Sequence, residues 1–284
     1  MTPPDDASNA AFAVTRETAP ITDANAAGSA DSRPYASIHA VPVGDIVAHS
    51  SRVAEAFYRG FEIVFALVSL IVGLPIMLVE GVLIRWDSPG PALFFHTRPG
   101  RSKMVLGREL VRRSDLIAPP GGYVPDALYY VPTYFRMVKF RTMYRDARNR
   151  FPGLYDYNFA PGEFRQRYGT LQHDPRVTRV GEILRKLSVD ELPNLWSVLV
   201  GDMRLAGPRP EAPEVLRYYT SEEMYKFSCK PGITGLAQIN GRGLLNWGKT
   251  LEWDLRYVRS RSVWLDLKII FVTLKYVVAR HGAF

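Results

Sequence analysis

The sequence contains one cysteine, Cys229, and few histidines. No intrachain disulfide can form, and a zinc site built from cysteines is excluded. A reducing compartment fits this composition. No histidine lies near Cys229 in the segment KFSCKPG, so we expect a buried or incidental thiol rather than a catalytic one. His173 has no second ligand at helical spacing and is expected to be structural or solvated.

Residues 1–50 lack hydrophobic periodicity, and they also lack the basic start and apolar core of a secretory signal. Their Ala, Asp, Ser, Thr and Pro residues cannot bury enough apolar surface to offset the entropy of ordering. We predict a disordered tail that is neither cleaved nor exported.

This tail is acidic, with two basic and six acidic residues and a net charge of −4, whereas the whole chain carries +8. The rest of the chain therefore carries +12 and is long enough for one compact domain. Such a body suits anionic lipid, phosphorylated ligands or nucleic acid, and charge alone does not choose among them.

Formal charge is missing from Ile63–Val79, which lies between Glu62 and Glu80. The run has the shortest length that can span a bilayer, and Pro75 predicts a kink within it. Basic residues flank the run on both sides, which favours a re-entrant helix-break-helix over 51–86 that enters and leaves through one leaflet. A spanning helix and a buried core helix are the alternatives.

Residues 101–133 show little periodicity and are predicted to be an inserted surface loop. The next segment, 134–143, alternates apolar and cationic residues as a half-exposed strand does, which places Lys139 and Arg141 on accessible faces. The alternative for these cations is an ordinary solvated strand edge.

The run 184–210 places the adjacent carboxylates Asp190 and Glu191 between Arg185 and Arg209. A carboxylate can act as nucleophile or metal ligand, and guanidinium groups bind phosphate oxygens in bidentate fashion. Pro193 predicts a helix that begins near Asp190. Asp190 as a helix cap, or a capping box formed by Ser188 and Glu191, is therefore the structural alternative, and it is compatible with chemistry at Asp190.

Three further helices are predicted, over 180–187, 211–225 and 263–279, the last with an apolar face suited to a core or to a membrane interface. The segment 231–243 reads as a glycine-punctuated loop in which Gln238, Asn240 and Arg242 supply polar groups to a ligand, or in which the glycines serve turns only. The overall expectation is an α+β, mostly helical fold.

Several segments, in this order, resemble the bacterial sugar transferases, the monotopic phosphoglycosyl transferases that act on polyprenyl phosphate. They are SPGPALFF, RPG, VKFRTM, DPRVTRVG, LRKLSVDELPNLWSVLVGDM, GPRP, PGITGLAQINGR and, more loosely, LEWDLRYV with LDLKI. The resemblance runs from about residue 59 to residue 284 and leaves out the tail and most of 101–133.

The resemblance implies a re-entrant membrane helix broken at Pro75, amphipathic interfacial helices, and a small catalytic domain over 87–284 on the cytoplasmic face of the bacterial inner membrane. It implies transfer of a sugar-1-phosphate from a nucleotide-sugar donor, usually a UDP-sugar, to undecaprenyl phosphate. Nucleoside monophosphate is released, and the undecaprenyl-diphosphate-sugar starts polysaccharide or glycoconjugate assembly. Membrane lipid is the expected partner, and nucleic acid is not.

By the same resemblance, Asp190 is the nucleophile that forms a covalent phosphosugar intermediate. A magnesium ion (Mg2+) is expected at Asp190 and Glu191, and Glu191 is expected to assist as base or metal ligand. The residues expected to bind substrate or phosphate are Lys139, Arg141, Arg185, Pro208, Arg209, Gln238, Asn240, Arg242 and Asp254.

Three positions depart from the family pattern. Leu74 precedes Pro75 where the family often has Ser, Arg204 stands where Ser is common, and Ala206 replaces a larger apolar residue. A cation beside GPRP is expected to alter donor recognition. A membrane-bound scaffold without activity and a nucleic-acid-binding protein are the alternative functions, while the sugar, the pathway and the oligomeric state stay open.

Overall fold

The computed structural model describes residues 38–39, 41–42, 52–113, 116–119, 121–155, 159, 161–167, 173–241 and 244–279. Arg242 and most of the predicted tail lie outside these ranges. Within 1–50, two short strands are described, β1 (Ile38–His39) and β2 (Val41–Pro42). These four residues therefore differ from the disordered tail predicted for 1–50.

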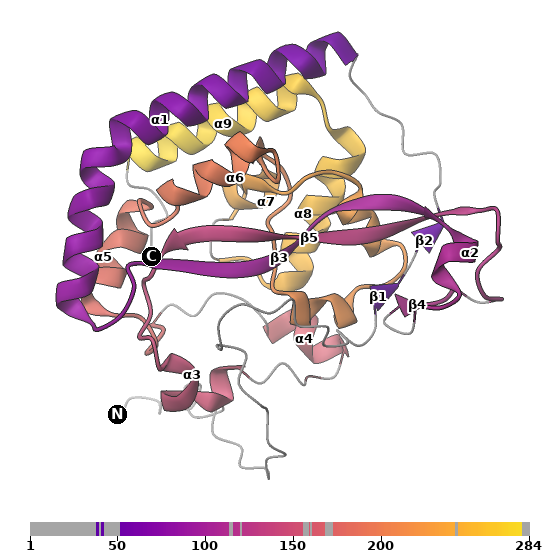
Figure 1. Cartoon of the computed structure of the whole chain (residues 1–284), viewed down its shortest axis with the longest axis horizontal. Helices are drawn as coiled ribbons and strands as arrows, with labels where there is room; N and C mark the ends of the chain where they lie inside the picture. The colour runs from indigo at the N-terminus through magenta and orange to yellow at the C-terminus, as the bar shows by residue number, and fades with distance from the viewer. Residues whose placement is uncertain are drawn as a thin grey trace, which may run out of the picture. The chain divides into compact units, whose positions relative to one another are not determined.

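The uncharged run lies within one long helix, α1 (Arg52–Asp87). By length and composition, Val53–Asp87 could cross a membrane, with a mean hydropathy of 2.5 and only 17% of the apolar window buried. Figure 1 shows α1 changing direction partway along its length, and Pro75 lies inside the helix. A proline removes one ladder hydrogen bond and crowds the preceding turn, which bends a helix without ending it. The predicted helix-break-helix is thus a single bent helix.

A long antiparallel hairpin, β3 (Leu93–Leu106) with β5 (Leu128–Phe140), crosses the middle of the view in Figure 1. Its register shifts between Pro99 and Ser102, and β2 pairs with the outer side of β5. The inserted loop predicted for 101–133 is wrong at both ends, because those residues extend the hairpin. Its far end carries the short helix α2 (Gly107–Leu110) and the strand β4 (Leu116–Ile117), which pairs with β1. The sequence shows no clear strand alternation here. The hairpin has different surroundings along its length, so polar and aromatic residues are mixed on both faces.

Between the hairpin and the catalytic run lie α3 (Ala147–Arg150), η1 (Pro152–Tyr155), α4 (Pro161–Arg167) and α5 (Arg179–Leu187). The predicted amphipathic helix 180–187 is confirmed as α5, which Thr178 caps by accepting a hydrogen bond from the Gly181 N–H. The 3-10 turn η2 (Leu192–Asn194) runs into α6 (Leu195–Val200), so a helical segment begins two residues after Asp190.

The remaining chain forms β6 (Arg204–Ala206), η3 (Pro213–Tyr218), η4 (Glu223–Ser228), β7 (Gly232–Thr234), α7 (Leu236–Ile239), α8 (Trp247–Ser260) and α9 (Val263–Val278). The α-helix predicted for 211–225 is instead two 3-10 helices, because Tyr219 is extended and Thr220 starts a new turn by bonding to Glu223. Strands β6 and β7 pair in parallel, and α9 confirms the helix predicted at 263–279.

The two halves of α1 pack on different parts of the same domain. Near its start, Tyr58 and Ala66 are buried with Met203 and Ile269 in one core cluster, to which α6 and α9, drawn beneath α1 in Figure 1, also contribute. Near its end, Ile84 is buried against Phe140 and Leu184, from β5 and α5. A third cluster fills the space between the far half of the hairpin, η3, η4 and α8. The α+β class is confirmed, and α1 contributes to two of its cores.

Candidate active site

Asp190 lies in the short link between α5 and η2, and its position is fixed through the backbone. Helix α5 ends at Ser188, whose φ of 57° is left-handed, and the Phe140 N–H at the end of β5 donates to the Asp190 carbonyl oxygen at 2.9 Å. Only 7% of Asp190 is exposed. The dyad is thus held where the hairpin meets α5 and α1.

The helix-cap alternative for the dyad is not what the structure has. Glu191 and Asn194 occupy the positions before η2 and α6, and neither makes a side-chain capping hydrogen bond. A helix cap therefore does not account for two adjacent carboxylates at this position, which leaves them available for chemistry.

Three predicted cations surround Asp190: Lys139 from β5, Arg185 from α5 and Arg209 from the segment after β6. Burial and the neighbouring Glu191 charge raise the pKa of Asp190, while these three cations oppose the rise. Burial also lowers the pKa of Lys139 to about 8, against the pull of Glu191 and Asp190. The three cations and the dyad are therefore brought together as predicted.

The cations differ in how firmly they are held. The Arg185 Nε donates to the Thr142 hydroxyl at 2.9 Å, and burial lowers the pKa of this guanidinium. Arg209 is exposed, on a segment whose Pro208 is buried and whose Pro208 carbonyl accepts from the Gly232 N–H at 3.0 Å. One guanidinium is thus fixed, and the other reaches outward from a rigid backbone.

Arg141 is not part of the site, contrary to prediction. Its guanidinium donates to the Ser88 hydroxyl, the Ser88 carbonyl and the Pro91 carbonyl, each at 2.8 Å. Arg141 is buried and holds the turn between α1 and β3. Strand alternation placed it on an accessible face, but β5 ends at Phe140, so the alternation no longer applies.

Two predicted polar residues of the glycine-rich segment serve their own backbone. The Asn240 amide donates to the Leu236 carbonyl at 2.8 Å, and the Gln238 amide reaches the Ile233 carbonyl at 3.5 Å. Much of this loop is helix α7. The prediction that these amides bind a ligand stays a prediction, and that for Arg242 falls outside the described residues.

Arg204, the cation expected to alter donor recognition, faces away from the dyad. Its guanidinium donates to Glu62 at 3.2 Å and to Glu55 at 2.7 Å, both on α1, and lies 4.5 Å from the Tyr58 ring centroid. The expectation for Arg204 is therefore corrected. This residue pairs with a buried carboxylate on α1, and sequence spacing could not reveal that pairing.

The model of the family described as bacterial sugar transferase matches residues 53–107 and 130–280. The chain belongs to the bacterial sugar transferase family. The unmatched stretch between the two segments is the far end of the β3–β5 hairpin.

Three relatives show the range of the family. The chain is 35% identical over 237 residues to an undecaprenyl-phosphate glucose phosphotransferase of Komagataeibacter xylinus, covering 80% of this chain and 36% of the relative. It is 32% identical over 241 residues to a UDP-galactose-lipid carrier transferase of Erwinia amylovora, covering 84% and 43%. It is 30% identical over 226 residues to the exopolysaccharide production protein ExoY of Sinorhizobium fredii, covering 80% and 87%. The chain spans less than half the length of the first two relatives.

For a sugar transferase of this family, Glu80 is a site residue that sequence reasoning missed. It lies on α1 with 3% of its surface exposed, and neither carboxylate oxygen has a hydrogen-bond partner among the described residues. Burial, and after it the Asp190 charge, raise the pKa of Glu80 to about 7, so the two carboxylates act on each other electrostatically. The available signal was a charge at the very end of an apolar run.

Arg98 and His96, on β3, also belong to this neighbourhood. Both act electrostatically with Lys139, and His96 stacks on Phe94, with ring centroids 5.8 Å apart. Arg98 stands within the RPG segment, which we matched to the family without assigning its arginine a role. The cationic side of the site is therefore wider than predicted.

The donor set suits a magnesium ion that completes its coordination with substrate. Among the described residues, no group of three or more His, Cys, Asp or Glu side chains is arranged to hold a metal. Mg²⁺ commonly uses one or two carboxylates together with substrate phosphates and water. Asp190 and Glu191 supply two such carboxylates, which fits an ion that takes its remaining ligands from substrate and water.

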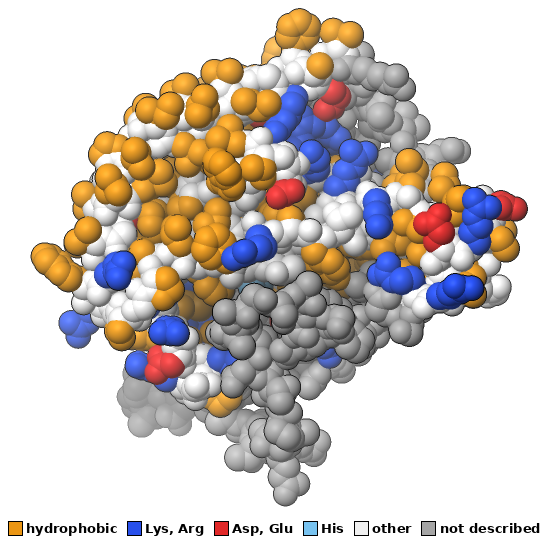
Figure 2. All heavy atoms as spheres, viewed as in Figure 1, with side chains coloured by type: hydrophobic (Ala, Val, Ile, Leu, Met, Phe, Trp, Pro, Cys, Tyr) orange, Lys and Arg blue, Asp and Glu red, His pale blue; other side chains and the backbone are white. Residues whose placement is uncertain are grey.

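The surface next to the site is strongly apolar. Figure 2 shows hydrophobic side chains crowded over the region that Figure 1 assigns to α1 and α9. Trp86 on α1 is 84% exposed, and Trp264 on α9 is 81% exposed. Tryptophan side chains favour the interface between lipid and water, so this surface suits membrane contact.

Proposed function

We propose that this protein transfers a sugar-1-phosphate from a UDP-sugar to undecaprenyl phosphate, through a covalent intermediate on Asp190. The observation that carries the proposal is the Asp190 carboxylate itself: buried, free of any helix-capping role, surrounded by Lys139, Arg185 and Arg209, and next to an apolar surface. The relatives' names support the lipid acceptor and the nucleotide-sugar donor.

The first step is attack by an Asp190 oxygen on the donor phosphorus that carries the sugar. A P–O bond forms to the aspartate, and the bond to the bridging oxygen breaks, so that UMP leaves with the electron pair. In the second step an oxygen of undecaprenyl phosphate attacks the same phosphorus and the Asp190 carboxylate departs. The product is undecaprenyl-diphosphate-sugar, the first lipid-linked unit of polysaccharide or glycoconjugate assembly.

A two-step route suits two anionic substrates, because donor and acceptor phosphates need not approach each other directly. Arg185 and Arg209 bind phosphate oxygens, and Lys139 stabilises the negative charge that develops on the transferred group. Mg²⁺ at Asp190 and Glu191 would neutralise the diphosphate when bound. Glu191 would serve as a second ligand of that ion or as a base.

We further propose that α1 enters and leaves the membrane on the cytoplasmic side of the inner membrane. Glu62, near the start of α1, contacts β6, and Ile84, near its end, packs on β5 and α5. A spanning helix would place these ends on opposite sides of a bilayer about 30 Å thick, away from a domain that touches both. The bend of α1 and its exposed apolar face support the re-entrant arrangement.

Activity is tested with purified protein in detergent, undecaprenyl phosphate and Mg²⁺, against a panel of nucleotide sugars. We expect one or a few UDP-sugars to yield UMP, and we expect Asp190→Asn to abolish the release while binding membranes normally. Asp202→Asn is the matched control, since Asp202 is exposed on the turn after α6. Release of no nucleoside monophosphate from any donor would favour an inactive scaffold.

Membrane topology is tested by labelling single cysteines in a Cys229→Ser background. One cysteine replaces Ser32 before α1, and another replaces the exposed Lys186 on α5. A membrane-impermeant reagent should label both from the cytoplasmic face only. Labelling of the two from opposite faces would show a spanning helix.

A further inference from the structure

Lys226, on η4, is a buried lysine that the mechanism does not use. Only 2% of it is exposed, and its ammonium group lies 2.8 Å from Glu211, 3.0 Å from Asp254 and 3.0 Å from the Tyr219 hydroxyl. Its carboxylate partners come from distant parts of the chain, Glu211 just before η3 and Asp254 on α8. Burying three charged groups costs desolvation free energy. A protein in which apolar residues replace a buried ion pair is often no less stable. The cluster therefore calls for a role beyond packing.

One carboxylate of this cluster, Glu211, belongs to the segment that carries Arg209. Glu211 is two residues after Arg209, and its second oxygen accepts from the Trp247 indole N–H. Asp254 is joined to the cluster through the Lys226 ammonium, and Lys226 itself lines a small pocket together with Pro208, Arg209 and Pro210. The segment is thus attached to Lys226 through Glu211, two residues after its arginine.

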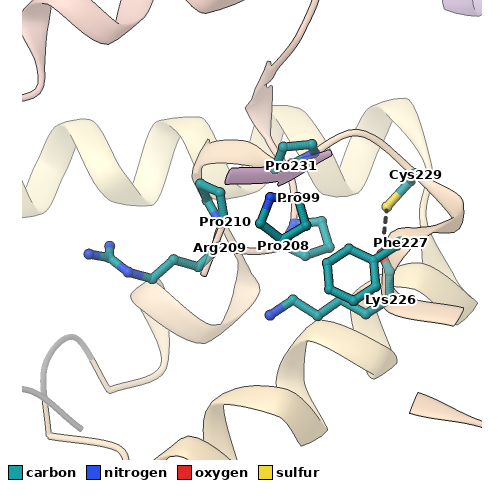
Figure 3. Close-up of a pocket in the computed structure, with 8 residues that line it drawn as sticks. All are labelled: Pro99, Pro208, Arg209, Pro210, Lys226, Phe227, Cys229 and Pro231. Carbon is teal, nitrogen blue, oxygen red and sulfur yellow. Dashed lines mark hydrogen bonds between the residues drawn. The ribbon is translucent and has the colours of Figure 1, made fainter. Parts of the chain in front are cut away.

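The segment is also rigid in itself. Pro208 and Pro210 fix φ on either side of Arg209, and the Pro208 carbonyl is bonded to the Gly232 N–H. In Figure 3 the Arg209 side chain extends away from the prolines, while Lys226 lies beside the same segment. The free end of Arg209 acts electrostatically on Asp190 and Arg185. The Arg209 side chain can therefore still move, whereas the buried cluster fixes the position of its backbone.

We infer that Lys226, Glu211 and Asp254 form a positioning cluster that places the Arg209 guanidinium to bind the diphosphate of the nucleotide-sugar donor. This inference rests on the proposed function. It also reassigns Asp254, expected from resemblance to bind substrate: it is completely buried and acts through Arg209.

The test is a double-mutant cycle between Asp254→Asn and Arg209→Ala, read out by UDP binding in titration calorimetry. The amide keeps the shape of Asp254 but loses its charge-assisted attraction to Lys226, which holds Glu211 and the segment of Arg209. We expect Asp254→Asn to weaken UDP binding about tenfold in the wild-type background. In the Arg209→Ala background it should weaken binding less than about twofold, because the guanidinium it positions is gone.

Glu223→Gln is the matched control, since it removes one partner of a different ion pair on the same 3-10 helix, with Arg165 at 2.6 Å. It should lower the unfolding temperature without weakening UDP binding. Lys226→Met is the stronger variant, and it should repeat the pattern of Asp254→Asn if it folds.

Equal losses in both backgrounds, or no loss in either, would overturn the inference. The binding assay needs no turnover, so a failure of this inference can be told apart from a failure of the proposed function. A chain that binds UDP with the predicted coupling but releases no UMP would retain the positioning cluster and lose the transferase proposal.

Discussion

Each end of α1 carries a buried carboxylate, and the two carboxylates differ in their hydrogen-bond partners. Near the start, Glu62 is completely buried and accepts hydrogen bonds from Arg204 and from the Leu205 N–H. Near the end, Glu80 is almost as buried, has no hydrogen-bond partner among the described residues, and has its pKa raised by burial and by the charge of a second carboxylate, Asp190. A buried charge without a partner is costly, so it persists where something other than folding requires it. The difference separates the anchored end of the helix from its functional end.

The largest expected effect comes from breaking the anchored end. Arg204→Met removes the nearer cation from the buried Glu62 carboxylate and leaves it only Arg59, whose guanidinium lies 3.5 Å away, which should destabilise the protein by about 3 kcal/mol. Denaturant unfolding in detergent measures it. The double variant Glu62→Leu, Arg204→Met should recover most of that loss, because it removes the buried carboxylate together with its main partner. A double variant as unstable as the single one would show that shape, not charge, fixes α1.

At the functional end, Lys139→Met should change how activity depends on pH. Lys139 lowers the pKa of Asp190, and the nucleophile must be ionised, so removing the cation should move the acid limb of kcat/KM to higher pH. We expect a shift of about one pH unit, equivalent to about 1.4 kcal/mol. A pH–rate profile of the residual activity measures it. An unshifted limb would mean that another group sets it.

A smaller gain in stability is expected from Glu80→Gln. The folded protein disfavours the ionised form of Glu80, so wild-type stability should fall as pH rises through the range where this carboxyl ionises. Glutamine removes that penalty. The unfolding temperature of the variant should therefore exceed that of the wild type more at pH 8 than at pH 5. The opposite trend would show that Glu80 has a cationic partner.

The smallest effect is expected at an exposed pair. Lys249 lies 2.9 Å from Glu252 on α8, and both side chains are well exposed. Lys249→Ala should change the free energy of unfolding by less than about 0.5 kcal/mol, because water screens the pair. A loss comparable to that of Arg204→Met would undermine the distinction between buried and exposed pairs.

The sequence was informative where structure is local. The uncharged run predicted a helix bent at Pro75, the amphipathic period predicted α5, and the resemblance brought Asp190, Lys139, Arg185 and Arg209 together. These assignments depend on neighbours along the chain or on family motifs.

Contacts between distant residues could not be predicted in this way. Arg204 pairs with a residue 142 positions away on α1, and Lys226 joins two segments through Glu211 and Asp254. Arg141 was misassigned because a strand period was extended one residue beyond the strand. A side chain's role there depends on which element lies opposite it, and one sequence does not contain that information.

The central claim is that Asp190 carries the phosphosugar. It is tested most directly by incubating the protein with the active UDP-sugar and Mg²⁺, without acceptor, and locating any added mass by peptide mass spectrometry. We predict one phosphosugar on the peptide containing Asp190, its loss on addition of undecaprenyl phosphate, and no adduct in Asp190→Asn. UMP release that continues in Asp190→Asn, or an adduct on another residue, would contradict the account.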